Sequence, residues 1–399
     1  MVCTTAVQRT PWYQAYQKSQ WQQRISNNLG IDVQFASIAF PAPEHFRIRQ
    51  LVCNHPETGK EILRIAQVNA SMDRSGWTVD LVSPELNGAQ IQVAKKIIHD
   101  WFLCRPQKSA SLLKLNVPQL AVYDGLESTR FQNVEVGLRP TDTVSTLWLR
   151  FSIEGQLFTE RANLKVERHH ALASPTTNWS FDSHDVAIPC KMLAGQFPSF
   201  RLFGEQAYFR GGIDWNLSDE RGLAELRGTF ESVDLGTATA RVGSPIRGKA
   251  NVSIDRAVIG DDRLQWAQGA ILSVQGNTVD PAWVMETVNR LRLPTAAAVT
   301  TTPSTATSIR LKFQLSPAGL MLVGQLRPSH NDYPIAMVNN NPIYGTTRWP
   351  ISVMQVRDWL QSTSTGLSAE SISSFLPWPA PNGPTSGETQ PPRIATDRR

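Results

Sequence analysis

Apolar and polar side chains alternate residue by residue over many stretches of this chain, and this period of two limits the fold more than any other feature. In the clearest example, Ile309, Leu311 and Phe313 are separated by Arg310 and Lys312. Successive side chains of a β-strand point to opposite faces, so alternation of this kind gives each strand one apolar and one polar face. The sequence therefore predicts a sheet with one buried and one solvated face.

The same alternation recurs along most of the chain and is interrupted by turn residues such as Gly59, Gly76 and Gly125. Gly260 and the two aspartates after it predict a hairpin between two such stretches. The expected strands are 61–71, 77–82, 113–123, 130–138, 146–153, 156–167, 249–259, 264–275 and 309–315.

Helical periodicity replaces the alternation in a few places. Apolar residues recur every four positions up to Leu29, and Gly30 then supplies a stop signal. Further along, Asp280 and Pro281 are a typical cap and first residue of a helix. The expected helices are 11–29, 93–103, 281–292 and 351–361, with a short one at 368–375.

These elements predict a mainly β fold with a few helices, in which a long twisted antiparallel sheet forms a groove. An N-terminal helix and short capping helices complete it. Residues 169–203, broken by histidines and prolines, are expected to form a loop or a poorly ordered edge. The expected regions are an N-terminal, membrane-proximal helix at 1–30, a β-rich region with one helix at 31–203, regular strands with a closing helix at 204–294, a flexible linker at 295–308, a hairpin with helices at 309–376 and a disordered tail at 377–399.

Composition and charge narrow the expected partners. The charged fraction is 18%, which is low for a compact cytosolic enzyme and common in sheet proteins. The net charge is +5, but lysine and arginine are scattered rather than clustered, which argues against a nucleic-acid partner. The excess of basic residues favours solubility and a weak attraction to acidic lipid headgroups. The four cysteines are far apart and predict free thiols.

The sequence carries no enzyme signature. It lacks a nucleophile elbow, a phosphate-binding loop, a dinucleotide fingerprint and a zinc-protease helix, so we expect no catalytic residue and no cofactor. A calcium site at Asp261 and Asp262 has too few carboxylates, and a tight turn explains this pair better.

One polar cluster suggests a metal site as an alternative. His169, His170, Asp182, His184 and Asp185 would come together if the segment that carries them folded back on itself. Histidines in a polar loop are more often simply solvated, so no metal is predicted.

An antiparallel sheet that curls without a second layer must offer its apolar face to a ligand or a partner. Acyl chains suit such a face because each buried methylene contributes about 0.8 kcal/mol without any catalytic group. The candidate lipid-groove residues are Ala250, Val252, Ile254, Val258, Leu264, Trp266, Leu272, Val274, Ile309, Leu311, Phe313 and Leu315.

Two parts of the chain resemble the AsmA-like family of envelope proteins. The first is L-G-I-D-V-Q-F-A-S-I from Leu29, followed by F-R-I-R-Q-L-V from Phe46. The second runs from Gly248 as G-K-A-N-V-S-I-D-R-A-V-I-G-D-D-R-L-Q-W-A-Q-G-A-I-L-S-V-Q-G and is followed by the D-P-A-W-V helix. The first segment is similar to the N-terminal part of proteins of that family, and the second is similar to their repetitive sheet.

The resemblance implies a non-enzymatic envelope protein that binds or conducts lipid, with a membrane surface and other envelope proteins as partners. It would lie on the periplasmic side of the inner membrane if an anchor precedes Met1, and would otherwise be soluble. Trp12, Tyr13, Tyr16 and Trp21, mixed with basic residues, are typical of a segment beside a membrane, and an amphipathic helix on the protein surface is the alternative. The alternative is a structural or carbohydrate-binding β-rich scaffold, because twelve tryptophans would also serve as stacking platforms.

Overall fold

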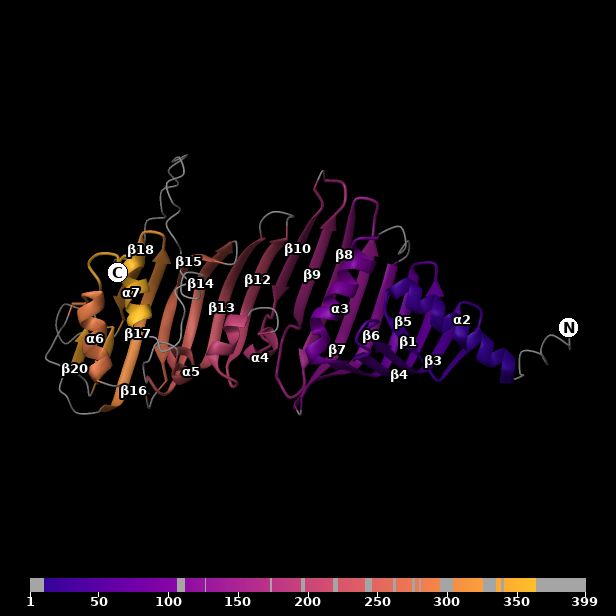
Figure 1. Ribbon diagram of the computed structural model, residues 1–399, viewed down its shortest axis with the longest axis horizontal. Helices are drawn as coiled ribbons and strands as arrows, with labels where there is room; N and C mark the ends of the chain where they lie inside the picture. Colours follow the sequence, from indigo (N-terminus) through magenta and orange to yellow (C-terminus); the bar gives the residue numbers. More distant parts are fainter. Residues whose placement is uncertain are drawn as a thin grey trace.

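The chain forms an elongated, curved sheet with helices along one side (Figure 1). The computed structural model describes residues 11–363, apart from residues 106–111, 126, 173, 195–197, 218–221, 241–245, 261–262, 275–276, 280, 295–303, 326–334 and 339–340. The expected helix at 368–375 and the expected disordered tail at 377–399 lie outside these residues.

Twenty strands among the described residues are linked by hydrogen bonds into an open, mostly antiparallel sheet. This arrangement confirms the mainly β fold predicted by the alternation. In chain order the strands are β1 (Asp32–Gln34), β2 (Ser37–Ala42), β3 (His45–Asn54), β4 (Glu61–Asp73), β5 (Gly76–Asn87), β6 (Leu112–Asp124), β7 (Glu127–Pro140), β8 (Val144–Ile153), β9 (Ala162–His169), β10 (Thr176–Asp182), β11 (Ile188–Pro189), β12 (Tyr208–Leu217), β13 (Gly222–Asp234), β14 (Lys249–Gly260), β15 (Arg263–Ser273), β16 (Asn277–Val279), β17 (Ser304–Ser316), β18 (Gly319–Gly324), β19 (Ala336–Val338) and β20 (Asn341–Tyr344).

Neighbours in the sheet follow the chain order, except that β1 pairs with β3, β10 pairs with β12 and β15 pairs with β17. β5 and β6 pair in parallel, whereas the other pairs between described strands are antiparallel. The beginning of β17 forms a small branch with β16, β19 and β20, which leaves seventeen strands in the main sheet. A parallel pair needs a crossover, and here the connection from β5 to β6 is helical.

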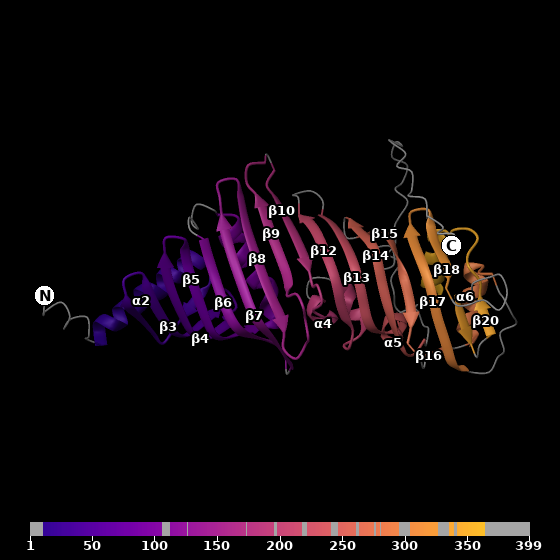
Figure 2. The same cartoon turned by 180° about the vertical axis from the view of Figure 1, so that it is seen from behind.

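The helices lie on one face of the sheet. Figure 1 shows them in front of the strands, and Figure 2, seen from behind, shows the strands in front. We call the face with the helices the concave face and the opposite one the convex face. The helical elements are α2 (Pro11–Leu29), η1 (Gly88–Gln90), α3 (Ile91–Ile97), η2 (Ile98–Leu103), α4 (Cys190–Leu193), η4 (Pro198–Phe203), α5 (Leu235–Thr239), α6 (Pro281–Leu291) and α7 (Val353–Thr363).

Local signals account for the ends of several helices. Gly30, with φ of 67°, donates to the carbonyl of Ser26 and ends α2, as expected. Ser352 and Gln355 form a reciprocal capping box that begins α7. The helix expected at 93–103 is present, but it begins at Ile91, and its second half, η2, is a π-helix.

Cross-strand register builds one continuous apolar row on the concave face. Paired residues of neighbouring strands point to the same side of a sheet, so the register defines the row. It crosses from β3 to β18 as Phe46, Ala70, Val79, Leu115, Val136, Leu149, Leu164, Phe181, Ile213, Leu226, Ala257, Ala267, Leu315 and Leu320.

The residues directly next to these in each strand form a polar row on the convex face. It contains Arg47, Asn69, Asp80, Asn116, Glu135, Arg150, Asn163, Asp182, Gly212 and Arg227. Its members bond to one another, as where Arg47 Nε donates to Asn69 Oδ1 at 3.2 Å and Asn116 Nδ2 donates to Asp80 Oδ1 at 3.1 Å. The two rows show that the predicted division into an apolar and a polar face extends over most of the sheet.

β-bulges accompany the curvature of the sheet. Asn133, with a φ of 51°, lies where the register between β7 and β8 shifts, whereas Gln50 and Ser83, with φ of 52° and 48°, interrupt the pairing of β3 and β5 with β4 without shifting its register. A β-bulge such as the one at Asn133 bends its strand and increases the local twist, and so contributes to the curvature of the sheet.

The structure corrects two expectations about irregular segments. Residues 169–203 are not a loop or an edge, because β10 lies between β9 and β12 within the sheet and places Trp179 and Phe181 in the core. The flexible linker expected at 295–308 is wrong for its last part, because Ser304 begins β17. Residues 295–303 lie outside the described residues.

Candidate functional site

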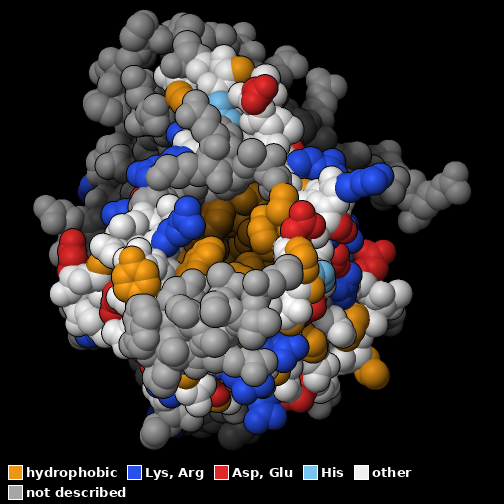
Figure 3. All heavy atoms as spheres, turned by 90° about the vertical axis from the view of Figure 1, so that its right-hand side faces the viewer, with side chains coloured by type: hydrophobic (Ala, Val, Ile, Leu, Met, Phe, Trp, Pro, Cys, Tyr) orange, Lys and Arg blue, Asp and Glu red, His pale blue; other side chains and the backbone are white. Residues whose placement is uncertain are grey.

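The concave face is hollowed and apolar. Figure 3 views the molecule from its N-terminal end and shows an opening lined with hydrophobic side chains and flanked by lysine and arginine. In the apolar row, Val79, Leu115, Val136, Leu149 and Leu164 are consecutive and half-buried. We call these five residues the open floor. They lie on β5 to β9 and form the longest consecutive half-buried stretch of the row, although Phe46 on β3, Leu315 on β17 and Leu320 on β18 are half-buried too.

The central part of the row is sealed. Phe181, Ile213 and Leu226 are buried in a core cluster that also contains Cys190 and Phe200, from α4 and η4. The rings of Phe200 and Phe230 meet edge to face at 5.2 Å between centroids. This part of the concave face is therefore a packed protein core.

The C-terminal part is sealed as well. Ala250 and Leu311 are buried beneath Val288 of α6 and beneath Val353 and Val356 of α7 in a separate cluster. The hydrophobic stripes of these two helices replace solvent over the strands.

The crossover from β5 to β6 places a helix on the concave face, with α3 packed towards β4 and η2 against β8, across the strands that carry the open floor. Asn87 begins it by accepting a bond from the amide of Ala89 at 3.1 Å, while its amide group donates to the carbonyl of Glu61 at 3.1 Å. At the other end, Leu103 is fully buried against Leu147 of β8. Both ends of the helix are thus held against the concave face of the sheet.

Polar groups gather on the concave face at the start of β8. The buried Ser145 Oγ lies 2.9 Å from Nε2 of His170, and Arg168 donates to Thr177 Oγ1 at 2.7 Å. Burial lowers the pKa of His170, and the charge of Arg168 lowers it further. Beside them, the Lys95 ammonium lies 5.0 Å from the ring centroid of Trp179, and burial lowers the pKa of Lys95. The trough therefore has a polar border next to its apolar floor.

The register divides the predicted groove residues between the two faces. Val252 pairs with Ile271 and Phe313 with Gly269, which places them on the concave side. The predicted residues on the concave face are Ala250, Val252, Ile254, Leu264, Ile309, Leu311, Phe313 and Leu315. They pack against the two core clusters, the first of which also contacts Val136, Leu149 and Leu164 of the open floor.

The expectation that Val258, Trp266, Leu272 and Val274 share that face is corrected by the register. Leu272 pairs with Asn251 and is 42% exposed, and Val274, just past the end of β15, is 46% exposed. Breaks in register between Ile254 and Arg256, and between Val258 and Ile259, reverse the alternation. The first break moves Val258 to the convex face, where it pairs with Trp266, and Trp266 shares that face with Leu272 by regular alternation along β15. The Arg256 guanidinium lies 5.9 Å from the Trp266 ring centroid there.

Sequence reasoning did not single out the open floor. Leu115, Val136 and Leu149 lie in strands that the alternation predicts correctly, so the signal for an apolar face was present. Which part of that face stays uncovered depends on where the helices pack, and the alternation carries no information about this.

The alternative metal cluster does not assemble among the described residues. Asp182 and His184 lie close together, and Nδ1 of His184 is 3.0 Å from a carboxylate oxygen of Glu160. Asp185 instead accepts a bond from the amide of Thr159 at 3.2 Å. The two upstream histidines lie at the opposite end of β9 and β10, where His169 pairs with Thr176.

The cysteines within the described residues are free thiols, as expected. Burial raises the pKa of Cys53 and of Cys190 to about 12, with the charge of Asp32 adding to the shift at Cys53. Cys104 is only half-buried.

Within the described part of the chain, none of the helices combines the length and the apolar character that crossing a bilayer requires. Comparisons of the chain with protein-family models, with curated proteins and with solved structures found no match.

Proposed function

We propose that the concave face binds the acyl chains of lipids, with the open floor as the contact surface. The observation that carries this proposal is the continuous apolar row, which is half-buried rather than sealed where it crosses β5 to β9. The neighbouring row on the convex face is polar. An incompletely covered apolar face of this kind is stabilised by a ligand that removes it from water.

The dimensions suit extended chains. Neighbouring strands lie about 4.8 Å apart, so the open floor from β5 to β9 extends over about 19 Å along the sheet. One leaflet of a bilayer is about 15 Å of hydrocarbon, so the open floor is about as long as one acyl chain. Each methylene moved from water to this surface contributes about 0.8 kcal/mol, so a chain of ordinary length binds without a catalytic group.

We further propose that the protein acts at a membrane surface of the cell envelope, in lipid homeostasis or in the transport of lipid between membranes. The resemblance of the two sequence segments to the AsmA-like family supports this role. The polar border of the trough supports it physically, because Lys95 and Arg168 can lie beside a headgroup while the chains contact the open floor.

The direct test is native mass spectrometry of the full chain after mild detergent extraction, followed by organic extraction and identification of the bound molecules. We expect copurified lipids with long acyl chains, and we expect added fatty acid to displace them. A preparation that is folded, free of lipid and unable to bind fatty acid would contradict the proposal. Binding of oligosaccharide by such a preparation would favour the scaffold or carbohydrate-binding alternative.

A further inference from the structure

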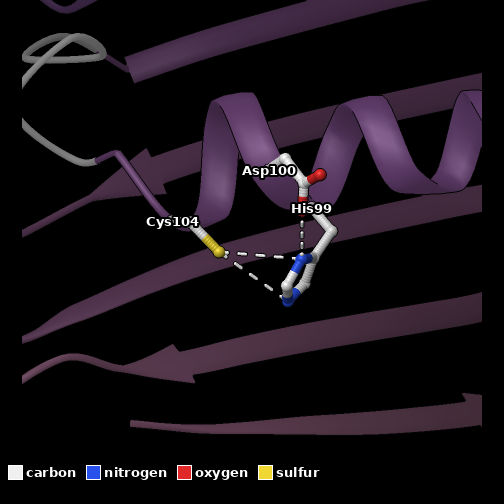
Figure 4. Close-up of side chains that lie close together, drawn as sticks. All are labelled: His99, Asp100 and Cys104. Carbon is white, nitrogen blue, oxygen red and sulfur yellow. Dashed lines mark hydrogen bonds and ion pairs between the residues drawn. The ribbon is translucent and has the colours of Figure 1, made fainter.

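Three side chains with metal-binding chemistry meet at the end of η2, beside the trough. Figure 4 shows His99, Asp100 and Cys104 gathered on the last helical turn. Nδ1 of His99 lies 2.9 Å from Oδ1 of Asp100, and Sγ of Cys104 lies 3.6 Å from the same Nδ1. One ligand atom from each residue lies within 4.8 Å of the other two.

The π-helical backbone explains why these residues meet. The amide of Cys104 donates to the carbonyl of His99 at 2.9 Å, which is the five-residue bond of a π-turn. In an α-helix each residue turns by about 100°, so residues five apart point about 140° away from each other. The wider π-turn brings positions 99 and 104 nearly above one another, and the buried Leu103 holds the turn against the sheet.

We propose that His99, Asp100 and Cys104 form a binding site for a single divalent cation of borderline softness, with Zn²⁺ as the best match and water as the fourth ligand. Imidazole, carboxylate and thiolate are the groups that bind Zn²⁺ in proteins. With a Zn–S bond of about 2.3 Å and a Zn–N bond of about 2.0 Å, tetrahedral ligands place sulfur and nitrogen about 3.5 Å apart. The distance of 3.6 Å between Sγ and Nδ1 is close to this value.

The solvent exposure and the charges of the three ligands also favour the binding of a cation. The His99 and Asp100 side chains are 30% and 43% exposed, so a cation and its water can enter from solvent. One thiolate and one carboxylate balance the two positive charges of the ion. Burial raises the pKa of the Cys104 thiol, whereas the neighbouring Arg168 charge opposes that rise. A proton therefore competes with the metal for the sulfur, and binding should strengthen as the pH rises through the neutral range.

The test is a titration of the full chain with Co²⁺, after reduction and removal of metals with a chelator. Co²⁺ occupies the same ligands as Zn²⁺ and reports them by absorption. We expect a thiolate-to-cobalt charge-transfer band together with the visible bands of four-coordinate cobalt, and both should disappear when Zn²⁺ is added. A titration without the charge-transfer band would overturn the proposal.

Variants separate this site from other thiols. Cys104→Ser should remove the charge-transfer band, and the exposed Asp100→Asn should weaken cobalt binding by about tenfold or more without disturbing the fold. Cys3→Ser and Cys190→Ala are the matched controls and should leave the band unchanged. A band that survives in Cys104→Ser, or cobalt affinity unchanged in Asp100→Asn, would overturn the assignment. Zn²⁺ should also raise the Tm of the parent protein but not that of Cys104→Ser.

Discussion

Replacing Leu149 by aspartate is expected to remove bound lipid while the protein stays folded. Leu149 is half-buried in the middle of the open floor, paired with Val136 on one side and Leu164 on the other. In the empty trough the carboxylate can remain hydrated, so we expect the Tm to fall by no more than about 5 °C. Against an acyl chain the same charge has no partner. We expect bound lipid to fall more than about 100-fold, because several kilocalories per mole are lost and each 1.4 kcal/mol is tenfold.

Leu272→Asp is the matched control for this experiment. Leu272 lies on a strand of the same sheet, but it is on the convex face and 42% exposed. The control should keep both its lipid and its Tm. Tm and lipid content must be measured on the same preparations by differential scanning calorimetry and native mass spectrometry. A folded Leu149→Asp protein that carries as much lipid as the parent would show that the open floor is not the binding surface.

Replacing Phe209 by alanine is expected to cause the largest loss of stability. Phe209 is fully buried in β12, and its ring lies 5.0 Å from that of Phe230 between centroids. Truncation removes the aromatic contacts and leaves a cavity in the sealed centre of the concave face. Substitutions of this kind lower the free energy of unfolding by about 3–5 kcal/mol. Urea unfolding followed by tryptophan fluorescence measures the change.

Tyr208→Ala serves as the control for this prediction. Tyr208 is the preceding residue of the same strand, and it is 39% exposed on the opposite face. Its truncation should cost about 1 kcal/mol or less, because little packed surface is lost. Equal losses in the two variants would contradict the conclusion that the centre of the trough is a closed core rather than an open groove.

The strength of local signals decided how well particular elements could be predicted. The hairpin of β17 and β18 and the end of α2 at Gly30 follow from patterns within a few residues, and both are present. β10 was missed because its strand, Thr176–Asp182, is short and lies between segments rich in histidine and proline. Its position between β9 and β12 depends on pairing with both neighbours, which residues 176–182 alone do not reveal.

The predicted groove residues show most directly what side-chain alternation can and cannot predict. Alternation correctly places Val252 and Ile254 together on the concave face. It fails for Val258, because an extra residue in β14 reverses every later side chain of that strand. A bulge of this kind arises from pairing between strands and leaves no clear mark on the hydrophobic pattern.

By itself, the sequence determined that this chain builds a long sheet with one apolar and one polar face, because side-chain alternation is a property of each strand alone. The tertiary structure decided which strands are bulged, which stretch of the apolar face the helices leave open, and that a π-turn brings His99 and Cys104 together. These features depend on contacts between distant segments. The burial of a side chain depends on which other segments pack against it. Leu149 and Leu311 lie in the same kind of apolar pattern, yet Leu149 is half-buried in the open floor and Leu311 is buried in a sealed core.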